Sequence, residues 1–154
     1  MGTPVTPRFR LAGRGDVETL VAFMREFYAI DAYPFDAGVA RAALAGLVAD
    51  AALGRAWLIL DGDTPIGYVV LTFGYSLEFH GRDAFVDELF IRADYRHRGV
   101  GTQTLRFVEG QCPALGVHAL HLEVERTNLA AQALYRKMGF RDHDRYLMTR
   151  WLTK

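Results

Sequence analysis

The stretch AFVDELFIRADYRHRGVGT, from Ala84 to Thr102, decides the fold of this 154-residue chain. Its first part, Ala84–Ile91, is rich in β-branched and aromatic residues and predicts a strand. The following RHRGVG, Arg96–Gly101, has two glycines spaced two apart before a predicted helix. Such a loop can turn backbone N–H groups toward one point, and the helix N-terminus adds its positive dipole end. With the charges of Arg96 and Arg98, the pattern predicts a phosphate-binding site.

Hydrophobic periodicity and turn residues predict the elements around this stretch. We expect strands at 8–12, 56–60, 66–73, 84–91, 119–124 and 146–152, and helices at about 16–31, 37–52, 99–111 and 128–138. The strands at 56–60 and 66–73 should form an antiparallel hairpin. The unit from 84 to 124 should be a right-handed parallel crossover. This order predicts a mixed α/β (α+β) fold rather than a Rossmann repeat.

Composition excludes several classes of function. The chain has no visible internal repeat, so a single domain over residues 1–154 is expected. Lys+Arg and Asp+Glu both number 18, which gives no net charge for binding nucleic acid or a membrane surface. No apolar run approaches the ~20 residues of a membrane span. No Cys/His grouping has metal-ligand spacing, so no metal is expected. One cysteine and the lack of a signal core predict a cytoplasmic protein.

A second block lies further along the chain: LEVERTN at Leu122–Asn128, then ALYRKMGF at Ala133–Phe140. Together with Arg96-x-x-Gly-x-Gly, it resembles the GNAT superfamily of N-acetyltransferases, over roughly Pro7 to Leu152. The resemblance implies a mostly antiparallel central sheet of about six to seven strands with a splayed parallel pair, flanked by about four helices.

The resemblance also implies acetyl-CoA (coenzyme A) as the cofactor, with its pantetheine arm in the cleft between the splayed strands. Backbone N–H groups near Leu89–Ile91 would stabilise the thioester oxygen. Asn128 would touch the cofactor arm, although it could equally be only a helix N-cap. The expected cofactor-binding residues are Leu89, Phe90, Ile91, Arg96, His97, Arg98, Gly99, Val100, Gly101, Thr102, Asn128 and Tyr135.

The matching motifs also suggest the catalytic residues. Tyr135 corresponds to the family tyrosine that points at the cofactor sulfur, and is expected to be the acid. For the base we expect Glu88 first, with Asp87 and Glu123 as alternatives. Asp87 and Glu88 are adjacent on a strand and should point to opposite faces. A carboxylate close to apolar strand residues should have a raised pKa, which would make it a better base.

The expected function is an acetyl-CoA-dependent N-acetyltransferase that acts by direct attack of a primary amine. Several carboxylates could make the acceptor side acidic, which favours a small cationic amine such as a polyamine; they are Asp31, Asp36, Asp87, Glu88 and Glu123. A protein N-terminal acetyltransferase is the alternative, and a non-catalytic acyl-CoA-binding module is a third possibility. A homodimer is also possible, through edge strands or through the strand that contains Trp151 and Leu152.

Overall fold

The computed structural model describes residues 2–153. The chain divides into two compact units, residues 2–122 and residues 123–153, and each unit is described by itself. The first unit contains the sheet and three of the four α-helices, and the second contains the last helix. No helix within the described residues is long and apolar enough to cross a membrane.

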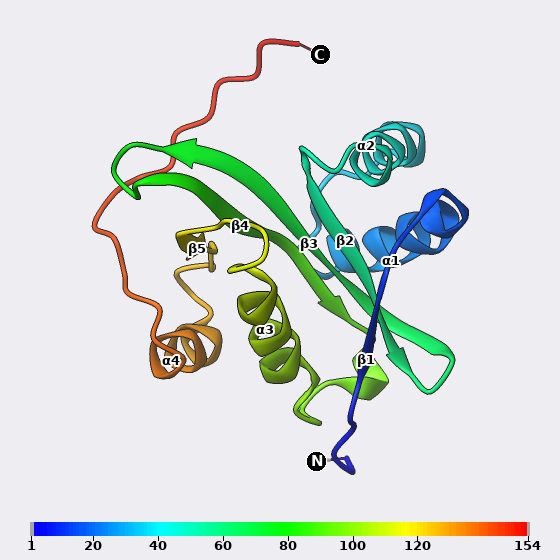
Figure 1. Ribbon diagram of the computed structural model, residues 1–154. Helices are drawn as coiled ribbons and strands as arrows, with labels where there is room; N and C mark the ends of the chain where they lie inside the picture. Colours follow the sequence, from blue (N-terminus) through cyan, green and yellow to red (C-terminus); the bar gives the residue numbers. More distant parts are fainter. Residues whose placement is uncertain (1, 154) are drawn as a thin grey trace. The chain divides into compact units, whose positions relative to one another are not determined.

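The first unit is built on a five-stranded sheet in which the strands follow one another in sequence order (Figure 1). The strands are β1 (Arg8–Leu11), β2 (Gly54–Asp61), β3 (Thr64–Ser76), β4 (Gly81–Ile91) and β5 (Ala119–His121). Neighbouring strands are antiparallel except β4 and β5, which are parallel. The predicted hairpin and the predicted parallel crossover are therefore confirmed.

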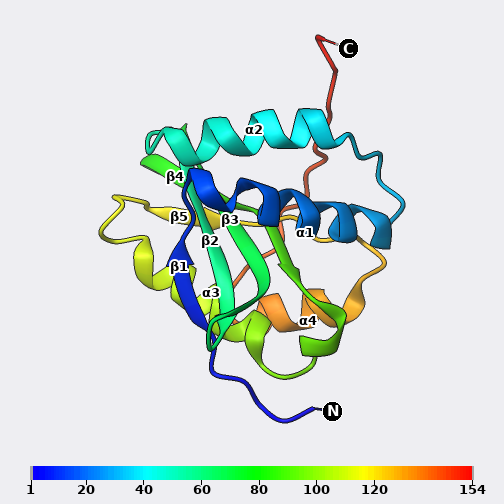
Figure 2. The same cartoon turned by 90° about the vertical axis from the view of Figure 1, so that its right-hand side faces the viewer.

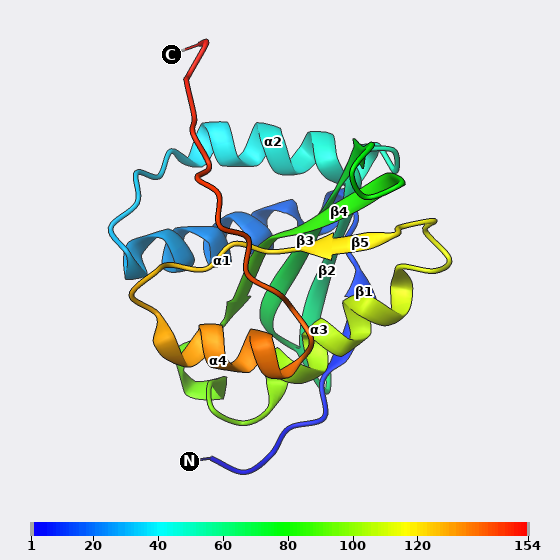
Figure 3. The same cartoon turned by 90° about the vertical axis from the view of Figure 1, so that its left-hand side faces the viewer.

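Helices cover both faces of this sheet. α1 (Val17–Ile30) and α2 (Ala37–Ala49) lie in front of it in Figure 2, and α3 (Val100–Gln111) lies on the opposite face, which Figure 3 shows. Short 3-10 turns at Arg14–Asp16 and Ala93–Tyr95 precede α1 and α3. The crossover from β4 to β5 thus passes through α3 on one face only.

Both faces of β2 carry apolar side chains, because helices cover both faces of the sheet. Ala56, Leu58 and Leu60 pack with Leu20 of α1 in one core cluster, whereas Trp57 belongs to a cluster on the other face. Successive strand side chains point to opposite faces, so a continuous apolar run is needed where both faces are covered. Burying each large apolar side chain contributes about 1.5–3 kcal/mol relative to leaving it in water.

An irregularity in β4 changes which side chains face α1. Val70 of β3 pairs with Glu88, but the next residue, Leu71, pairs with Val86, so Asp87 is an extra residue in β4. Such a β-bulge re-aims the side chains that follow it. After the bulge, Phe90 packs in the same cluster as α1.

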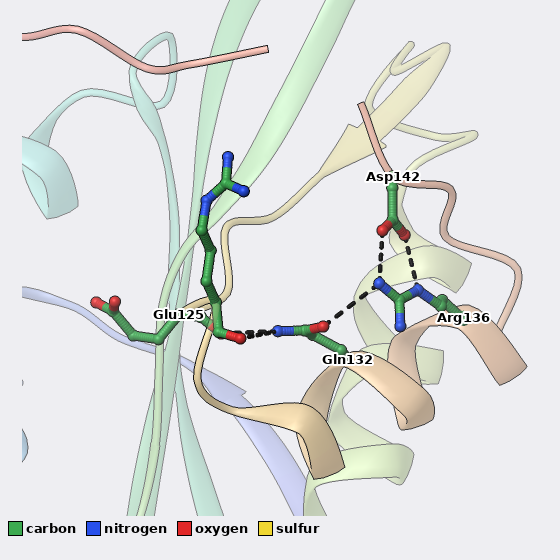
Figure 4. Close-up of polar contacts among 5 residues, drawn as sticks. Glu125, Gln132, Arg136 and Asp142 are labelled. Atoms are coloured by element: carbon green, nitrogen blue, oxygen red, sulfur yellow. Dashed lines mark hydrogen bonds and ion pairs between the residues drawn. The ribbon is translucent and has the colours of Figure 1, made fainter. Parts of the chain in front are cut away.

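The second unit consists of α4 (Leu129–Lys137) and the segments that flank it. The Gln132 amide donates to the carbonyls of Glu125 (3.0 Å) and Arg126 (2.9 Å), and accepts from Arg136 (Figure 4). Arg136 also binds the Asp142 carboxylate, with Nε 2.8 Å from Oδ1. These contacts join the segments before and after α4 to the helix.

One predicted strand is shorter than expected, and the prediction of another is wrong. The predicted strand at 119–124 ends at His121, and the predicted strand at 146–152 is absent. Residues 2–153 therefore form five strands rather than six to seven. Strand propensity alone cannot form a strand, because the backbone N–H and C=O groups need a neighbouring strand. The large apolar side chains of the C-terminal segment are 74–88% exposed; they are Tyr146, Leu147, Met148, Trp151 and Leu152.

Candidate functional site

Two neighbouring carboxylates, Asp87 and Glu88, lie at the bulge in β4, and Glu88 contacts α1. Glu88 is partly buried and accepts hydrogen bonds on both oxygens, from the Tyr28 hydroxyl on Oε2 and from the Tyr68 hydroxyl on Oε1 (2.8 Å). Asp87 is more exposed, and its carboxylate accepts no hydrogen bond from any residue within 2–153. The two neighbouring acids therefore have different environments.

Burial dominates the electrostatics of this group. It raises the pKa of Glu88 above 4.5; the two tyrosine hydrogen bonds lower that pKa, and the Asp87 charge raises it further. Desolvation also raises the pKa of Asp87 above 3.8. Burial and the negative charge of Glu88 raise the pKa values of Tyr28 and Tyr68, and Asp87 adds to both shifts. Both phenols therefore keep their protons at neutral pH and remain hydrogen-bond donors.

Aromatic rings extend from this group along the loop after α1. The Tyr28 ring makes edge contacts with Tyr33 (6.2 Å between centroids) and Phe35 (6.0 Å). The Arg25 guanidinium lies 5.4 Å from the Phe35 ring centroid. Phe27 packs instead against the core, near Tyr68 and Phe90. Tyr28 thus contacts Tyr33 and Phe35 with its ring, and Glu88 with its hydroxyl.

The loop between β4 and α3 has the conformation expected of a phosphate cradle. His97 and Gly99 have positive φ values of 60° and 82°, and α3 starts at Val100. Among residues 2–153, no acceptor binds the backbone N–H groups from Gly99 to Thr102. The first N–H groups of a helix lack intrahelical partners and form a natural anion site. The cradle is therefore a property of backbone rather than of side chains.

The two arginines of this loop are held differently. Arg96 Nε donates to the Ile91 carbonyl at the end of β4 (2.9 Å). Arg98 Nε donates to the Thr3 carbonyl (2.7 Å), and its Nη1 donates to the Asp94 carbonyl (3.2 Å). The contact between Arg98 and Thr3 was not predicted, because a backbone carbonyl far away in the sequence leaves no pattern of residue types. Phosphate contact by either arginine stays a prediction.

Other residues expected at the cofactor have side chains that are buried or packed against the core. The side chains of Phe90 and Val100 are buried in the core, and those of Leu89 and Ile91 pack against it. β5 pairs with β4 only from Asp83 to Phe85, so within the described residues no strand pairs with that edge of β4 beyond Phe85. All three residues of β5 pair with β4, so the splaying of the parallel pair that the resemblance implies stays a prediction; the edge of β4 next to the bulge has no strand partner within residues 2–153.

An unpredicted polar contact lies where β4 and β5 pair. His121 Nε2 is 3.0 Å from Asp83 Oδ2, and both side chains are largely buried. The His121 ring contacts the rings of Phe79 and Phe85, with centroids 4.5 and 5.0 Å apart. The pair joins the last residue of β5 to the strand that carries the two acids.

The second unit contains the remaining predicted site residues. Asn128 caps α4 by accepting from the Ala131 N–H (3.1 Å). Tyr135 is partly buried, its ring lies 6.0 Å from Phe140, and burial raises the pKa of its hydroxyl. Glu123 is exposed and lies beyond the end of β5. The catalytic roles of these residues remain predictions. No group of three or more His, Cys, Asp or Glu among residues 2–153 could hold a metal ion.

A model described as the acetyltransferase (GNAT) family matches residues 19–140, which include the bulge, the phosphate cradle and α4. The chain belongs to the GNAT family. The match covers most of the chain and agrees with the two sequence blocks that first suggested this family.

The chain also resembles curated acetyltransferases over part of its length. The chain is similar to the thialysine N-epsilon-acetyltransferase of Bos taurus, with 28% identity over 82 residues. The match covers 53% of this chain and 48% of the relative. The chain thus spans about half the length of the curated relatives it matches.

Solved structures show the same fold over nearly the whole chain. An integron cassette protein from the mobile metagenome of Cole Harbour Salt Marsh is 36% identical, with a TM-score of 0.83; the match covers 95% of this chain and 91% of that one. A predicted acetyltransferase from Clostridium acetobutylicum, determined with acetyl-CoA, has a TM-score of 0.80 at 16% identity, and the match covers 94% and 96% of the two chains. At this identity the second likeness concerns the fold alone.

Proposed function

We propose that the protein is an acetyl-CoA-dependent N-acetyltransferase that acetylates a primary amine on a small cationic molecule by direct attack. The observation that carries the proposal is the partly buried Glu88, which two tyrosine hydroxyls hold beside the exposed Asp87. Membership of the GNAT family supports the reaction type, and the geometry around Glu88 supports the charge of the acceptor.

The phosphate cradle supports acetyl-CoA as the cofactor. Four successive N–H groups, Gly99 to Thr102, have no acceptor within residues 2–153 and fit the oxygens of a pyrophosphate. A side chain at Gly99 would be strained at its φ of 82°. The C. acetobutylicum acetyltransferase of the same fold was determined with acetyl-CoA. When bound, the cofactor would supply the acetyl thioester.

The acceptor would bind as a cation beside Glu88. An ammonium group gains from a carboxylate and from aromatic ring faces within about 6 Å. Glu88 and the rings of Tyr28, Tyr33 and Phe35 offer this combination on one side of the sheet. The curated relative is named for acetylating an amine nitrogen of thialysine, which agrees with a small amine as the acceptor.

We propose that Glu88 and Asp87 have different roles in the reaction. Both oxygens of Glu88 are already hydrogen-bonded, so Glu88 would hold the substrate cation in place. Asp87 has no such partner within residues 2–153 and has a raised pKa, so it would take the proton from the attacking amine. Tyr135 would give a proton to the departing sulfur, because burial keeps its hydroxyl protonated. Glu123 remains the alternative base.

The test is thiol release from acetyl-CoA across a panel of polyamines, lysine and thialysine, aminoglycosides and N-terminal peptides. We expect turnover on one class of small cationic amine, with loss of that turnover in Asp87→Asn. Acetylation of peptides alone would instead identify a protein N-terminal acetyltransferase. A protein that binds acetyl-CoA but turns over no amine would point to the non-catalytic module. The homodimer and the cytoplasmic location stay predictions, which a measured solution mass and fractionation of cells would test.

A further inference from the structure

The N-terminal segment binds the phosphate cradle through a set of reciprocal contacts. The Val5 N–H donates to the Arg98 carbonyl (3.2 Å), and Arg98 Nε donates back to the Thr3 carbonyl (2.7 Å). Gln103 of α3 donates from Nε2 to the Val5 carbonyl (2.7 Å) and to the Gly99 carbonyl (3.2 Å). We call residues 3–5 the strap. It contacts both the loop and the first turns of α3.

Apolar burial anchors the strap to the same place. Val5 is only 7% exposed and packs in a cluster with Ile59, Ile66 and Val100. Val100 is the first residue of α3, so the strap touches the helix where its free N–H groups begin. The hydrogen bond from Gln103 to the Val5 carbonyl is partly buried beside this apolar contact, whereas the hydrogen bonds of Arg98 are exposed.

The loop needs such support, because its backbone conformation is unfavourable without it. His97 has a φ of 60°, in the left-handed region that costs a residue with a Cβ roughly 1–2 kcal/mol. Together with the φ of 82° at Gly99, this conformation sets the direction of the N–H groups that follow. A strained conformation persists only where the surrounding contacts hold it.

The guanidinium of Arg98 is engaged by protein groups. Besides the Thr3 carbonyl, it donates to the Asp94 carbonyl (3.2 Å), and it lies 5.0 Å from the centroid of the Tyr95 ring. Arg98 thus links the strap to the turn that contains Asp94 and Tyr95, and such a link can hold the loop in its conformation. Gln103 has no charge, and its amide makes the equivalent link on the helix side.

We propose that Arg98 and Gln103 are positioning residues, which bind the strap to the loop and so set the affinity for the cofactor's phosphates without contacting them. The inference rests on the proposed function, because it takes acetyl-CoA as the ligand of the cradle. If Arg98 acted only through its charge, Gln103 and Val5 would not affect the affinity for acetyl-CoA. In the proposal, the uncharged Gln103 and the apolar Val5 affect this affinity as much as Arg98 does.

The experiment measures the Kd of acetyl-CoA by calorimetry for the full chain and for four variants: Arg98→Met, Arg98→Lys, Gln103→Met and Val5→Ala. Loss of one or two hydrogen bonds predicts a Kd about threefold to tenfold higher for Gln103→Met and Arg98→Met. Because both changes release the same strap, the double variant should weaken binding by less than the product of the single effects. Val5→Ala tests the strap with no polar change. In turnover assays the variants should raise the KM for acetyl-CoA by a larger factor than they lower kcat, because the strap supports the phosphate site and not the reacting atoms.

Two controls separate the strap from charge and from stability. Arg106→Met removes an exposed charge from α3 and should leave Kd unchanged. Leu47→Ala removes a core contact in α2 on the other face of the sheet, and should lower the melting temperature without changing Kd. An unchanged Kd in Gln103→Met and Val5→Ala, with normal affinity in Arg98→Lys, would overturn the proposal and assign Arg98 a charge role. A wild-type chain that does not bind acetyl-CoA would contradict the proposed function itself, and the inference with it.

Discussion

The hydroxyl of Tyr68 lies 2.8 Å from Oε1 of Glu88, and the two residues occupy neighbouring strands of the same sheet. The Tyr68 side chain is fully buried, whereas Glu88 is only partly buried. The hydrogen bond therefore reaches from the core to the edge of the candidate acceptor site. It holds the Glu88 carboxylate in one orientation, and it lowers a pKa that burial alone would raise further.

Removing the Tyr68 hydroxyl should weaken the action of Glu88 on a cationic substrate and leave the packing of the core intact. In Tyr68→Phe, Glu88 loses one hydrogen bond and its pKa rises, so less of the carboxylate is ionised at a given pH. A hydrogen bond to a charged group predicts a loss of roughly tenfold in kcat/KM for a cationic amine. The acid limb of the pH profile should move to higher pH. Tyr75→Phe, at a tyrosine that is 80% exposed, is the matched control.

Asp87 should make the free energy of unfolding decrease as pH rises. Its folded-state pKa is raised above 3.8, so the folded protein binds a proton more tightly than the unfolded chain. The stability that this proton contributes is fully present below the unfolded pKa, and is lost as pH rises through the folded pKa. Asp87→Asn should therefore become more stable than the wild type as pH rises above 4, in urea unfolding at a series of pH values.

Glu18 is the control with the opposite sign. Its hydrogen bond with Arg41 lowers its pKa below 4.5, so its contribution is present above the unfolded pKa and is lost as pH falls through the folded pKa. Glu18→Gln should then lose stability, slightly, at neutral pH. Equal pH profiles for Asp87→Asn and the wild type would show that Asp87 is not desolvated.

Tyr135 should affect turnover rather than binding. Replacing its hydroxyl by hydrogen in Tyr135→Phe removes the proposed proton donor and keeps the ring contact with Phe140. General acid catalysis predicts a fall in kcat of about 10²-fold or more, with the Kd of acetyl-CoA unchanged. Stopped-flow release of the thiol would measure it. Tyr146→Phe, at an exposed tyrosine of the same unit, should be neutral, and an unchanged kcat in Tyr135→Phe would exclude the acid role.

The turn after α1 contains a backbone conformation that glycine would relieve. Ala32 has a φ of 54°, and the next N–H, of Tyr33, donates to the Tyr28 carbonyl (2.9 Å) to close the helix. Ala32→Gly should stabilise the protein by about 0.5–1 kcal/mol, the left-handed cost less the added chain entropy of glycine. Thermal unfolding would measure it. Ala22→Gly, at an exposed position within α1, should destabilise by a similar amount.

Much of this fold follows from local patterns in the sequence. Leu20 and Val21 recur at helical spacing with the residues of the next turns, and both are buried. The apolar Val39 lies in the first turn of α2 and is nevertheless 68% exposed. Propensity and periodicity locate an element well, but which of its faces is covered depends on a partner that the pattern does not name.

The candidate site was less predictable than the fold. The motif around Arg96 and Gly99 located the loop before α3, because glycine spacing has a direct backbone meaning; phosphate binding by this loop stays a prediction. The bulge at Asp87 gave no signal, since no glycine or proline marks it, and alternation alone predicted opposite faces for Asp87 and Glu88. The pairing of Glu88 with Tyr28 and Tyr68 is a tertiary contact between three elements, which sequence spacing cannot reveal.

The sequence-ordered sheet described above has a kinetic consequence. β2, β3 and β4 are joined by short turns, so their pairing closes small loops, whereas β5 pairs with β4 only after the whole crossover through α3. Non-local pairing forms late because its loop-closure entropy is lost before its contacts form. We expect a φ-value near zero for Leu120→Ala in β5 and a higher one for Val69→Ala in β3. The antiparallel meander would thus assemble first, and the parallel strand would be the last to join it.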